Sequence, residues 1–225
     1  MDAFSDKKII DSWRKNAIPW IDTVQESLIE SRRLITNEAI IESVMSVSAK
    51  TVIDIGCGEG WLIRELSSLG LFVSGLDVIS ELVQEAEKFG SGKFHVMAYE
   101  DLSDSKITEK FDVAVCNFSL LGKESVEHVF KVVPGFLNRG GHFIVQTLHP
   151  IVSCEKDTYI DGWREGSWEG FSRDFRDPAP WYFRTIESWI RLFHESGYEL
   201  VQFKEPMNPE TGKVASLIMA GRVTG

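Results

Sequence analysis

Three regularly spaced glycines, Gly56, Gly58 and Gly60, directly follow the apolar run Val52-Ile53-Asp54-Ile55. Glycine lets a backbone turn tightly and approach a ligand, because a Cβ at such a position would clash or forbid a positive φ angle. The residues from Trp61 onward have the period of an amphipathic helix. A strand, a glycine turn and a helix in this order predict a cradle for a nucleotide cofactor.

The acidic residue ahead of the turn, Asp54, bears on the kind of cofactor. A pyrophosphate needs free backbone N–H groups and the positive end of a helix, so a carboxylate there favours a cationic ligand instead. S-adenosylmethionine carries a sulfonium and an ammonium and no phosphate, and G-x-G-x-G differs from the dinucleotide pattern G-x-G-x-x-G. The segment resembles motif I of the class I S-adenosylmethionine-dependent methyltransferases. The resemblance also assigns Cys57 and Trp61 to the cofactor; a glycine turn that binds nothing is the alternative.

Further candidates lie at the ends of the next two expected strands, where parallel sheets bind their ligands. Asp77, about twenty residues after the turn, is expected to accept hydrogen bonds from both ribose hydroxyls, with Val78 beside it. Its alternative role is to cap the following helix together with Ser80. Tyr99 and Glu100 resemble the part of the family that recognises adenine.

The fourth expected strand ends in Asn117 and Phe118, which resemble the family's motif IV at the methyl-donor site. Asn117 would supply a polar contact and Phe118 an apolar wall; core packing is the alternative for Phe118. The family's N-P-P-Y or D-P-P-Y motif, which marks enzymes that methylate nucleic-acid bases, is absent. The two arginines Arg32 and Arg33 are expected to lie near the cofactor, and Arg33 is assigned to the methionine carboxylate, because a guanidinium suits such a partner. A solvated surface position is the alternative.

An aromatic segment of residues 149–185 is expected to cover the site. It pairs aromatic rings with guanidinium groups at Trp163 and Arg164 and again at Tyr182 and Arg184, a combination that suits a planar or an anionic small molecule. The alternative is a self-packed lid with solvated arginines.

His149, at the end of the fifth expected strand, is the first candidate for a general base, and Glu205 is the second. A histidine at a strand end also has a common structural role. No metal site is expected.

Composition limits the classes of partner. The chain has 225 residues and a formal net charge of −10, which argues against a general grip on nucleic-acid phosphates. Three widely separated cysteines indicate reduced thiols, and the sequence has neither a membrane-span candidate nor a signal-peptide core. We therefore expect a cytoplasmic protein without a membrane or nucleic-acid partner, as a monomer or homodimer.

Alternating strand and helix periods predict an α/β fold. Strands are expected at 51–55, 71–76, 93–97, 111–117, 142–148, 198–204 and 214–221, and helices at 61–69, 81–89, 124–137 and 186–195. The family resemblance implies a Rossmann-like, doubly wound seven-stranded sheet of order 3-2-1-4-5-7-6, mostly parallel, with the last strand antiparallel.

We expect one domain over 1–225. It comprises an N-terminal helical cap (1–48, its second helix capped by Thr36), a cofactor-binding half (49–148), the aromatic lid (149–185) and a C-terminal helix and strand pair (186–225). The expected function is methyl transfer from S-adenosylmethionine, with S-adenosylhomocysteine as product, to a small-molecule acceptor. The alternatives are a nicotinamide-dependent oxidoreductase and a non-catalytic cofactor-binding regulator.

Overall fold

The computed structural model of the protein describes residues 3–89, 92–103, 106–154 and 157–224. Seven strands form one sheet of order β3-β2-β1-β4-β5-β9-β8, in which β9 is antiparallel to both of its neighbours. Its strands are β1 (Thr51–Ile55), β2 (Phe72–Asp77), β3 (Lys93–Val96), β4 (Phe111–Asn117), β5 (Leu137–Thr147), β8 (Tyr198–Lys204) and β9 (Leu217–Val223).

The strand order confirms the doubly wound expectation. Because β6 and β7 belong to a separate two-stranded sheet, β8 and β9 are the sixth and seventh strands of the main sheet along the chain. Only the labels therefore differ from 3-2-1-4-5-7-6. The order reverses between β1 and β4, so the carboxyl ends of these two strands border a crevice.

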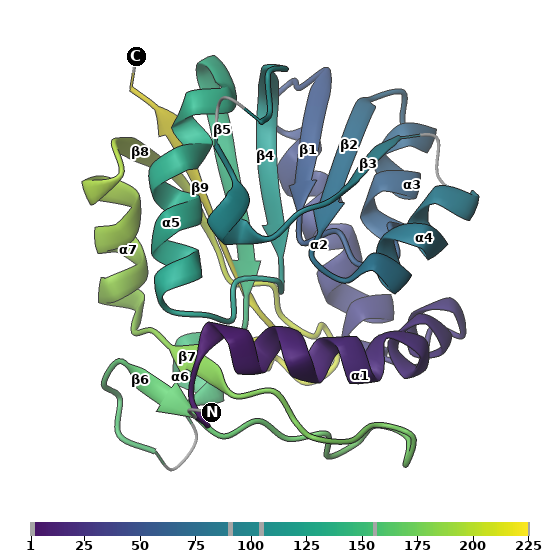
Figure 1. Cartoon of the computed structure of the whole chain (residues 1–225). Helices are drawn as coiled ribbons and strands as arrows, with labels where there is room; N and C mark the ends of the chain where they lie inside the picture. Colours follow the sequence, from purple (N-terminus) through teal and green to yellow (C-terminus); the bar gives the residue numbers. More distant parts are fainter. Residues whose placement is uncertain (1–2, 90–91, 104–105, 155–156, 225) are drawn as a thin grey trace.

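Helices cover both faces of the sheet (Figure 1). One buried cluster joins the sheet to α5 (Glu124–Val132) and α7 (Ile186–Glu195), and a second joins it to α2 (Asn37–Met45) and α3 (Trp61–Ser68). The first cluster contains Phe130, whose ring lies 4.9 Å from that of Phe143 on β5 and 4.9 Å from that of Phe193 on α7. These contacts hold the sheet rigid behind its carboxyl edge.

The longest helix, α1 (Asp6–Gln25), runs across the carboxyl ends of the strands (Figure 1). A small apolar cluster, Ala17 and Ile21 of α1 with Ile79 and Leu82, attaches it to the start of α4 (Ser80–Phe89). The cap thus closes one side of the edge where a ligand is expected.

Several expected boundaries were wrong. The helix expected to reach residue 137 ends at Val132, and the short 3-10 turn Val133–Phe136 follows, because Pro134 cannot continue an α-helical hydrogen-bond ladder. As a result β5 begins at Leu137 rather than at residue 142. The side chain of Thr36 does not cap α2, because the π-helical turn Arg32–Thr36 runs directly into that helix.

The segment without a period, residues 149–185, contains the short helix α6 (Pro150–Ser153) and the antiparallel pair β6 (Gly162–Arg164) and β7 (Trp181–Phe183). It packs beneath α1 at the N-terminal side of the molecule (Figure 1). A further 3-10 turn, Tyr99–Asp101, follows β3. None of the helices in the described part of the chain combines the length and apolar character that a membrane crossing needs.

Candidate functional site

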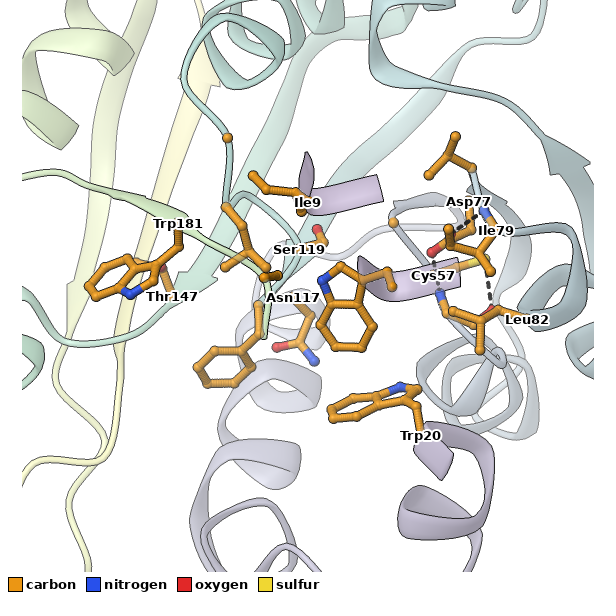
Figure 2. A pocket seen from close by; sticks show the side chains of 18 of the residues that line it. Ile9, Trp20, Cys57, Asp77, Ile79, Leu82, Asn117, Ser119, Thr147 and Trp181 are labelled. Carbon is orange, nitrogen blue, oxygen red and sulfur yellow. Dashed lines mark hydrogen bonds between the residues drawn. The ribbon is translucent and has the colours of Figure 1, made fainter. Parts of the chain in front are cut away.

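A cavity of about 450 Å³ lies at the carboxyl ends of the strands. One end is bordered by the glycine turn and Asp77; the other is bordered by Thr147 and the lid residue Trp181. Figure 2 shows Cys57, Asp77, Ile79 and Leu82 on one side of this space and Trp181 with Thr147 on the opposite side. Asn117 and Ser119 lie between the two groups. We call these the cofactor end and the lid end.

The glycine turn is held against β2 by its own backbone. The N–H groups of Gly56 and Cys57 both donate to the carbonyl of Leu76, at 2.8 and 2.9 Å. A Cβ on Gly56 would lie 2.4 Å from both Ser119 Cβ and Tyr99 Oη, so glycine is needed there for packing. A Cβ on Gly58 would meet only Trp20 Nε1, at 3.8 Å, so this glycine leaves room on the cavity side.

Asp77 connects the turn to the next helix. Its Oδ2 accepts a hydrogen bond from the Gly58 N–H at 3.0 Å, and its Oδ1 accepts one from the Ile79 N–H at 2.9 Å. Burial raises the pKa of Asp77 to about 6, although these hydrogen bonds act in the opposite direction. The carboxylate therefore makes a local cap-like contact and also faces the cavity, whose wall includes Asp77 and Val78.

Asp54 lies behind the glycine turn and is 3 % exposed. Its Oδ1 finds no hydrogen-bond partner among the described residues. Burial, followed by the charges of Asp77 and Glu59, raises the pKa of Asp54 to about 8. A buried, unpartnered carboxylate of this kind is costly unless a cationic group from a ligand compensates it.

The sequence analysis missed Glu59, whose side chain is almost fully buried in the turn. Its Oε1 accepts from the Trp61 N–H at 3.1 Å and from Arg64 Nη2 at 3.2 Å. Burial raises the pKa of Glu59, and the charges of Arg32 and Arg64 oppose that effect. Its position between Gly58 and Gly60 in the G-x-G-x-G pattern could have identified Glu59 as a candidate site residue.

The arginine at the cofactor end is Arg32, which corrects the expectation for Arg33. The Arg32 guanidinium lies 5.5 Å from the ring centre of Trp20 and 4.9 Å from that of Trp61, and burial lowers its pKa. Arg33 is exposed and lines a neighbouring second cavity instead. Successive side chains of a helical turn point in different directions, so only one of the two faces this site.

The remaining cofactor candidates lie on the wall: Tyr99, Glu100, Asn117 and Phe118. The cavity is also lined by residues 56–59 of the glycine turn and by Trp61. Asp54 and Gly60 do not line it. Phe118 adopts a φ of 53°, which is rare for a bulky residue and is held by a 2.8 Å hydrogen bond from its N–H to the carbonyl of Gln146. Such strain is typical of ligand sites.

The four lid residues expected to bind the acceptor do not line the cavity. The Arg184 guanidinium donates to the carbonyls of Gly122 and Lys123, at 2.8 and 3.0 Å. Arg164 donates to two carbonyls of its own segment, those of Thr158 and Ile160. Arg164 therefore holds its own segment together, and Arg184 fastens the lid to the loop after β4. The lid is packed on itself and on its neighbours, but the buried Arg184 is not solvated as the alternative supposed.

Trp163 and Tyr182 face each other across β6 and β7, with ring centres 5.5 Å apart. Adjacent residues of a strand point to opposite faces, so Trp181 reaches the cavity and Tyr182 does not. The aromatic wall that α1 and the lid give the cavity was not selected from the sequence. It consists of Trp13, Trp168, Phe171 and Trp181.

The two candidate bases are partners of each other. His149 Nε2 lies 2.8 Å from Glu205 Oε1, and the His149 ring is 4 % exposed. His149 does not line the cavity, although Thr147 and Leu148 directly before it do. Its geometry supports a positioning role at the end of β5 better than contact with an acceptor.

A family model described as a methyltransferase domain matches residues 30–203. The chain belongs to this methyltransferase family. With the seven-stranded sheet, this membership confirms the expectation of a class I S-adenosylmethionine-dependent methyltransferase.

Individual methyltransferases show the same likeness. The ubiquinone biosynthesis O-methyltransferase of Rickettsia felis is 24 % identical over 208 residues, covering 83 % of this chain and 81 % of that protein. Protein 235L of Invertebrate iridescent virus 6, which bears a methyltransferase name, is 27 % identical; the match covers 80 % of this chain and 66 % of the viral protein, just under two thirds. An S-adenosylmethionine-dependent methyltransferase structure from Mesorhizobium loti has a TM-score of 0.62, 23 % identity, and coverage of 82 % and 96 %.

Residues 166–179 of this methyltransferase, which we call the lid segment, are tied to α1 by a polar latch. Asp177 pairs with Lys8, at 2.6 Å, and with Lys15. Asn16 donates to the carbonyl of Arg176 at 2.7 Å and accepts from the Arg176 N–H at 2.9 Å. The hydrogen bonds from the two lysines lower the pKa of Asp177 to about 2, so its charge persists throughout the neutral range.

Replacing Asp177 by asparagine removes the charge of the latch while tolerating the φ of 50° at this position. We expect amide hydrogen exchange in residues 166–179 to accelerate by roughly 3-fold, with little change in Tm, because exposed ion pairs contribute little to global stability. Mass spectrometry of exchanged peptides measures this. Asp174→Asn, an exposed carboxylate of the same segment, is the control. Equal exchange in the two variants would contradict the latch.

Proposed function

We propose that this protein transfers a methyl group from S-adenosylmethionine to a small-molecule acceptor bound beneath the lid. The observation that carries the proposal is that one cavity joins the glycine turn to an aromatic chamber, with Asp54 behind the turn and its Oδ1 without a partner among the described residues. One relative is named as an O-methyltransferase of ubiquinone biosynthesis, which supports a small-molecule acceptor.

The residues of the cofactor end fit S-adenosylmethionine. Gly58 leaves space for close approach, and Asp77 offers carboxylate oxygens for the ribose hydroxyls. Asp54 and Glu59 supply negative charge for the ammonium and sulfonium, and Arg32 supplies a guanidinium for the methionine carboxylate. Tyr99 and Glu100, which also line the cavity, would contact the adenine.

When bound, the cofactor supplies an electrophilic methyl group. The chain's own contribution is to hold two reactants in line and to exclude water. Phe118 and Trp181 give the space apolar sides, while α1 and the lid segment cover it from outside. His149, paired with Glu205, fixes the end of β5 next to the wall residues Thr147 and Leu148.

The size of the cavity favours a compact acceptor. Its total of about 450 Å³ must hold the methyl donor as well, which leaves little room for a macromolecule with the lid closed. The net charge of −10 also supports an acceptor other than a nucleic acid. Neither the family match nor the Asp54 carboxylate favours the nicotinamide alternative.

The proposal is tested by incubating the protein with S-adenosylmethionine labelled in its methyl group and with pooled small-molecule extracts. We expect label to appear in a low-molecular-weight product together with S-adenosylhomocysteine. Wild-type protein that binds the cofactor and yet labels only added protein or nucleic acid would refute the small-molecule acceptor.

A further inference from the structure

Outside the glycine turn, apolar and aromatic side chains make up most of the cavity wall. They reach from Trp181 at the lid end to Phe171, whose ring lies 6.4 Å from that of Trp20 near the cofactor end. They come from α1, the ends of β4 and β5, and the lid segment with β7. These residues are Ile9, Ile10, Trp13, Phe118, Leu121, Leu148, Trp168, Phe171 and Trp181.

The aromatic rings form a packed set. Trp13 meets Trp168 edge to face at 5.6 Å and Trp20 at 5.1 Å, while Trp168 lies 5.5 Å from Phe171. The indole N–H of Trp168 already donates to the carbonyl of Arg176 at 3.1 Å. These rings therefore offer flat apolar faces, which favour a planar guest through offset or edge-to-face contacts.

Four positive side chains of the lid and of α1 have partners away from the cavity, and Lys7, Arg14, Arg173 and Arg176 do not line it. Arg164 and Arg184 donate to backbone carbonyls, and Lys8 and Lys15 pair with Asp177. Among the residues that the structure describes, Arg32 is the one Lys, Arg or His side chain on the cavity wall, and it lies at the cofactor end beside Trp20 and Trp61.

Negative charge, by contrast, is present on the wall. Asp6 reaches the cavity from the start of α1, and its two oxygens accept from the N–H groups of Lys123 and Ser125 at 2.8 and 2.6 Å. Asp77, Glu59 and Glu100 add further carboxyl groups toward the cofactor end. Apart from Arg32, an anionic acceptor would lose its hydration here without a cationic side chain of the described residues to replace it.

From this arrangement we infer that the acceptor is a flat, mainly apolar molecule that carries no negative charge, with Trp181 as a specificity-determining residue. The inference rests on the proposed function, because it assigns the substrate class of that site. The lid sequence was compatible with either a planar or an anionic acceptor. The inference favours the planar acceptor.

The test uses three naphthalene probes of nearly equal size: 2-naphthylmethanol, 2-naphthylmethylamine and 2-naphthoate. Their binding to the protein saturated with S-adenosylhomocysteine is measured by calorimetry. We expect the alcohol and the amine to bind at least about 10-fold more tightly than the carboxylate, because only the latter brings an uncompensated negative charge.

Three variants make the outcome specific. Trp181→Ala should weaken binding of the alcohol by about 10-fold, whereas Trp163→Ala, on the same two-stranded sheet and off the wall, should not change it. Leu148→Lys places a cation on the wall at a half-exposed position and should improve binding of the carboxylate by about 10-fold.

Tighter binding of the carboxylate to the wild-type protein, failure of all three probes to bind, or equal effects of Trp181→Ala and Trp163→Ala would each overturn the inference. The saturating titration with S-adenosylhomocysteine reports on the proposed function separately. If that titration shows binding while the carboxylate is preferred, only the acceptor class is wrong.

Discussion

Replacing Asp77 by alanine lowers the affinity for S-adenosylmethionine by about 100-fold or more. Each hydrogen bond between a charged group and a neutral one contributes about 1.5–3 kcal/mol, and two ribose hydroxyls would be lost from a buried site. The substitution also frees the Gly58 N–H that Asp77 holds at 3.0 Å, so the turn loses its anchor. Isothermal calorimetry of wild-type and variant proteins measures the change.

The matched control for Asp77→Ala is Glu87→Ala, which removes an exposed carboxylate from α4, the helix that starts beyond Asp77. We expect its affinity to equal that of the wild type. If both variants bind alike, or if Asp77→Ala loses less than about 3-fold in a protein with unchanged circular dichroism, the ribose role of Asp77 is wrong.

The second large effect concerns Asp54→Asn, for which stability and binding should change in opposite directions. Asparagine keeps the shape of the side chain and removes a buried charge that no described residue compensates. The unliganded variant should therefore have a higher Tm near pH 8, by about 2–4 °C for each kcal/mol relieved. Its affinity for S-adenosylmethionine should fall by at least about 10-fold, since the cationic ligand loses its partner.

The pH dependence gives the sign of this effect. An unfolded Asp54 releases its proton near pH 3.8, whereas in the folded protein its pKa is raised to about 8 by burial and by Asp77 and Glu59. Between these values the folded state binds more protons than the unfolded state, so the stability of the unliganded protein falls as pH rises from about 4 to 8. Asp54→Asn should flatten this fall, and the gap between variant and wild type should be small near pH 4.

Thermal unfolding followed by circular dichroism across this pH range measures the gap. Asp112→Asn is a useful control, because the pKa of Asp112 is lowered by hydrogen bonds that include the N–H groups of Lys50 and Thr51, so this variant should lose stability. A loss of stability in Asp54→Asn at pH 8 would show that the Asp54 carboxylate is compensated within the protein.

The sequence was sufficient for the fold and for the backbone of the cofactor end. Alternating periods predicted the seven strands of the main sheet, although not all of their boundaries and not the pair β6 and β7. The family resemblance predicted the order of the seven strands. The glycine turn and Asp77 were also predicted, since a ligand at a strand end requires particular residue types at fixed spacing. The glycine turn and Asp77 are close together in the sequence, so local patterns were enough to predict them.

The lid end could not be predicted because it depends on side-chain direction and on distant partners. Trp181 and Tyr182 are neighbours in the sequence, yet strand alternation sends only Trp181 to the cavity. Arg184 resembled an anion-binding residue, but its guanidinium is held by carbonyls about sixty residues away. Similarly, Arg32 and Arg33 were not separable before the π-helical turn was known.

The central claim is that the cavity is shaped and charged for S-adenosylmethionine at its glycine turn. Calorimetric titration of the wild-type protein with S-adenosylmethionine, and with NADH as the competing class of cofactor, tests it most directly. We predict one site per chain for S-adenosylmethionine, with affinity reduced in both Asp54→Asn and Asp77→Ala, and no heat from NADH. Saturable binding of NADH, or a folded protein that gives no signal with S-adenosylmethionine, would contradict the claim.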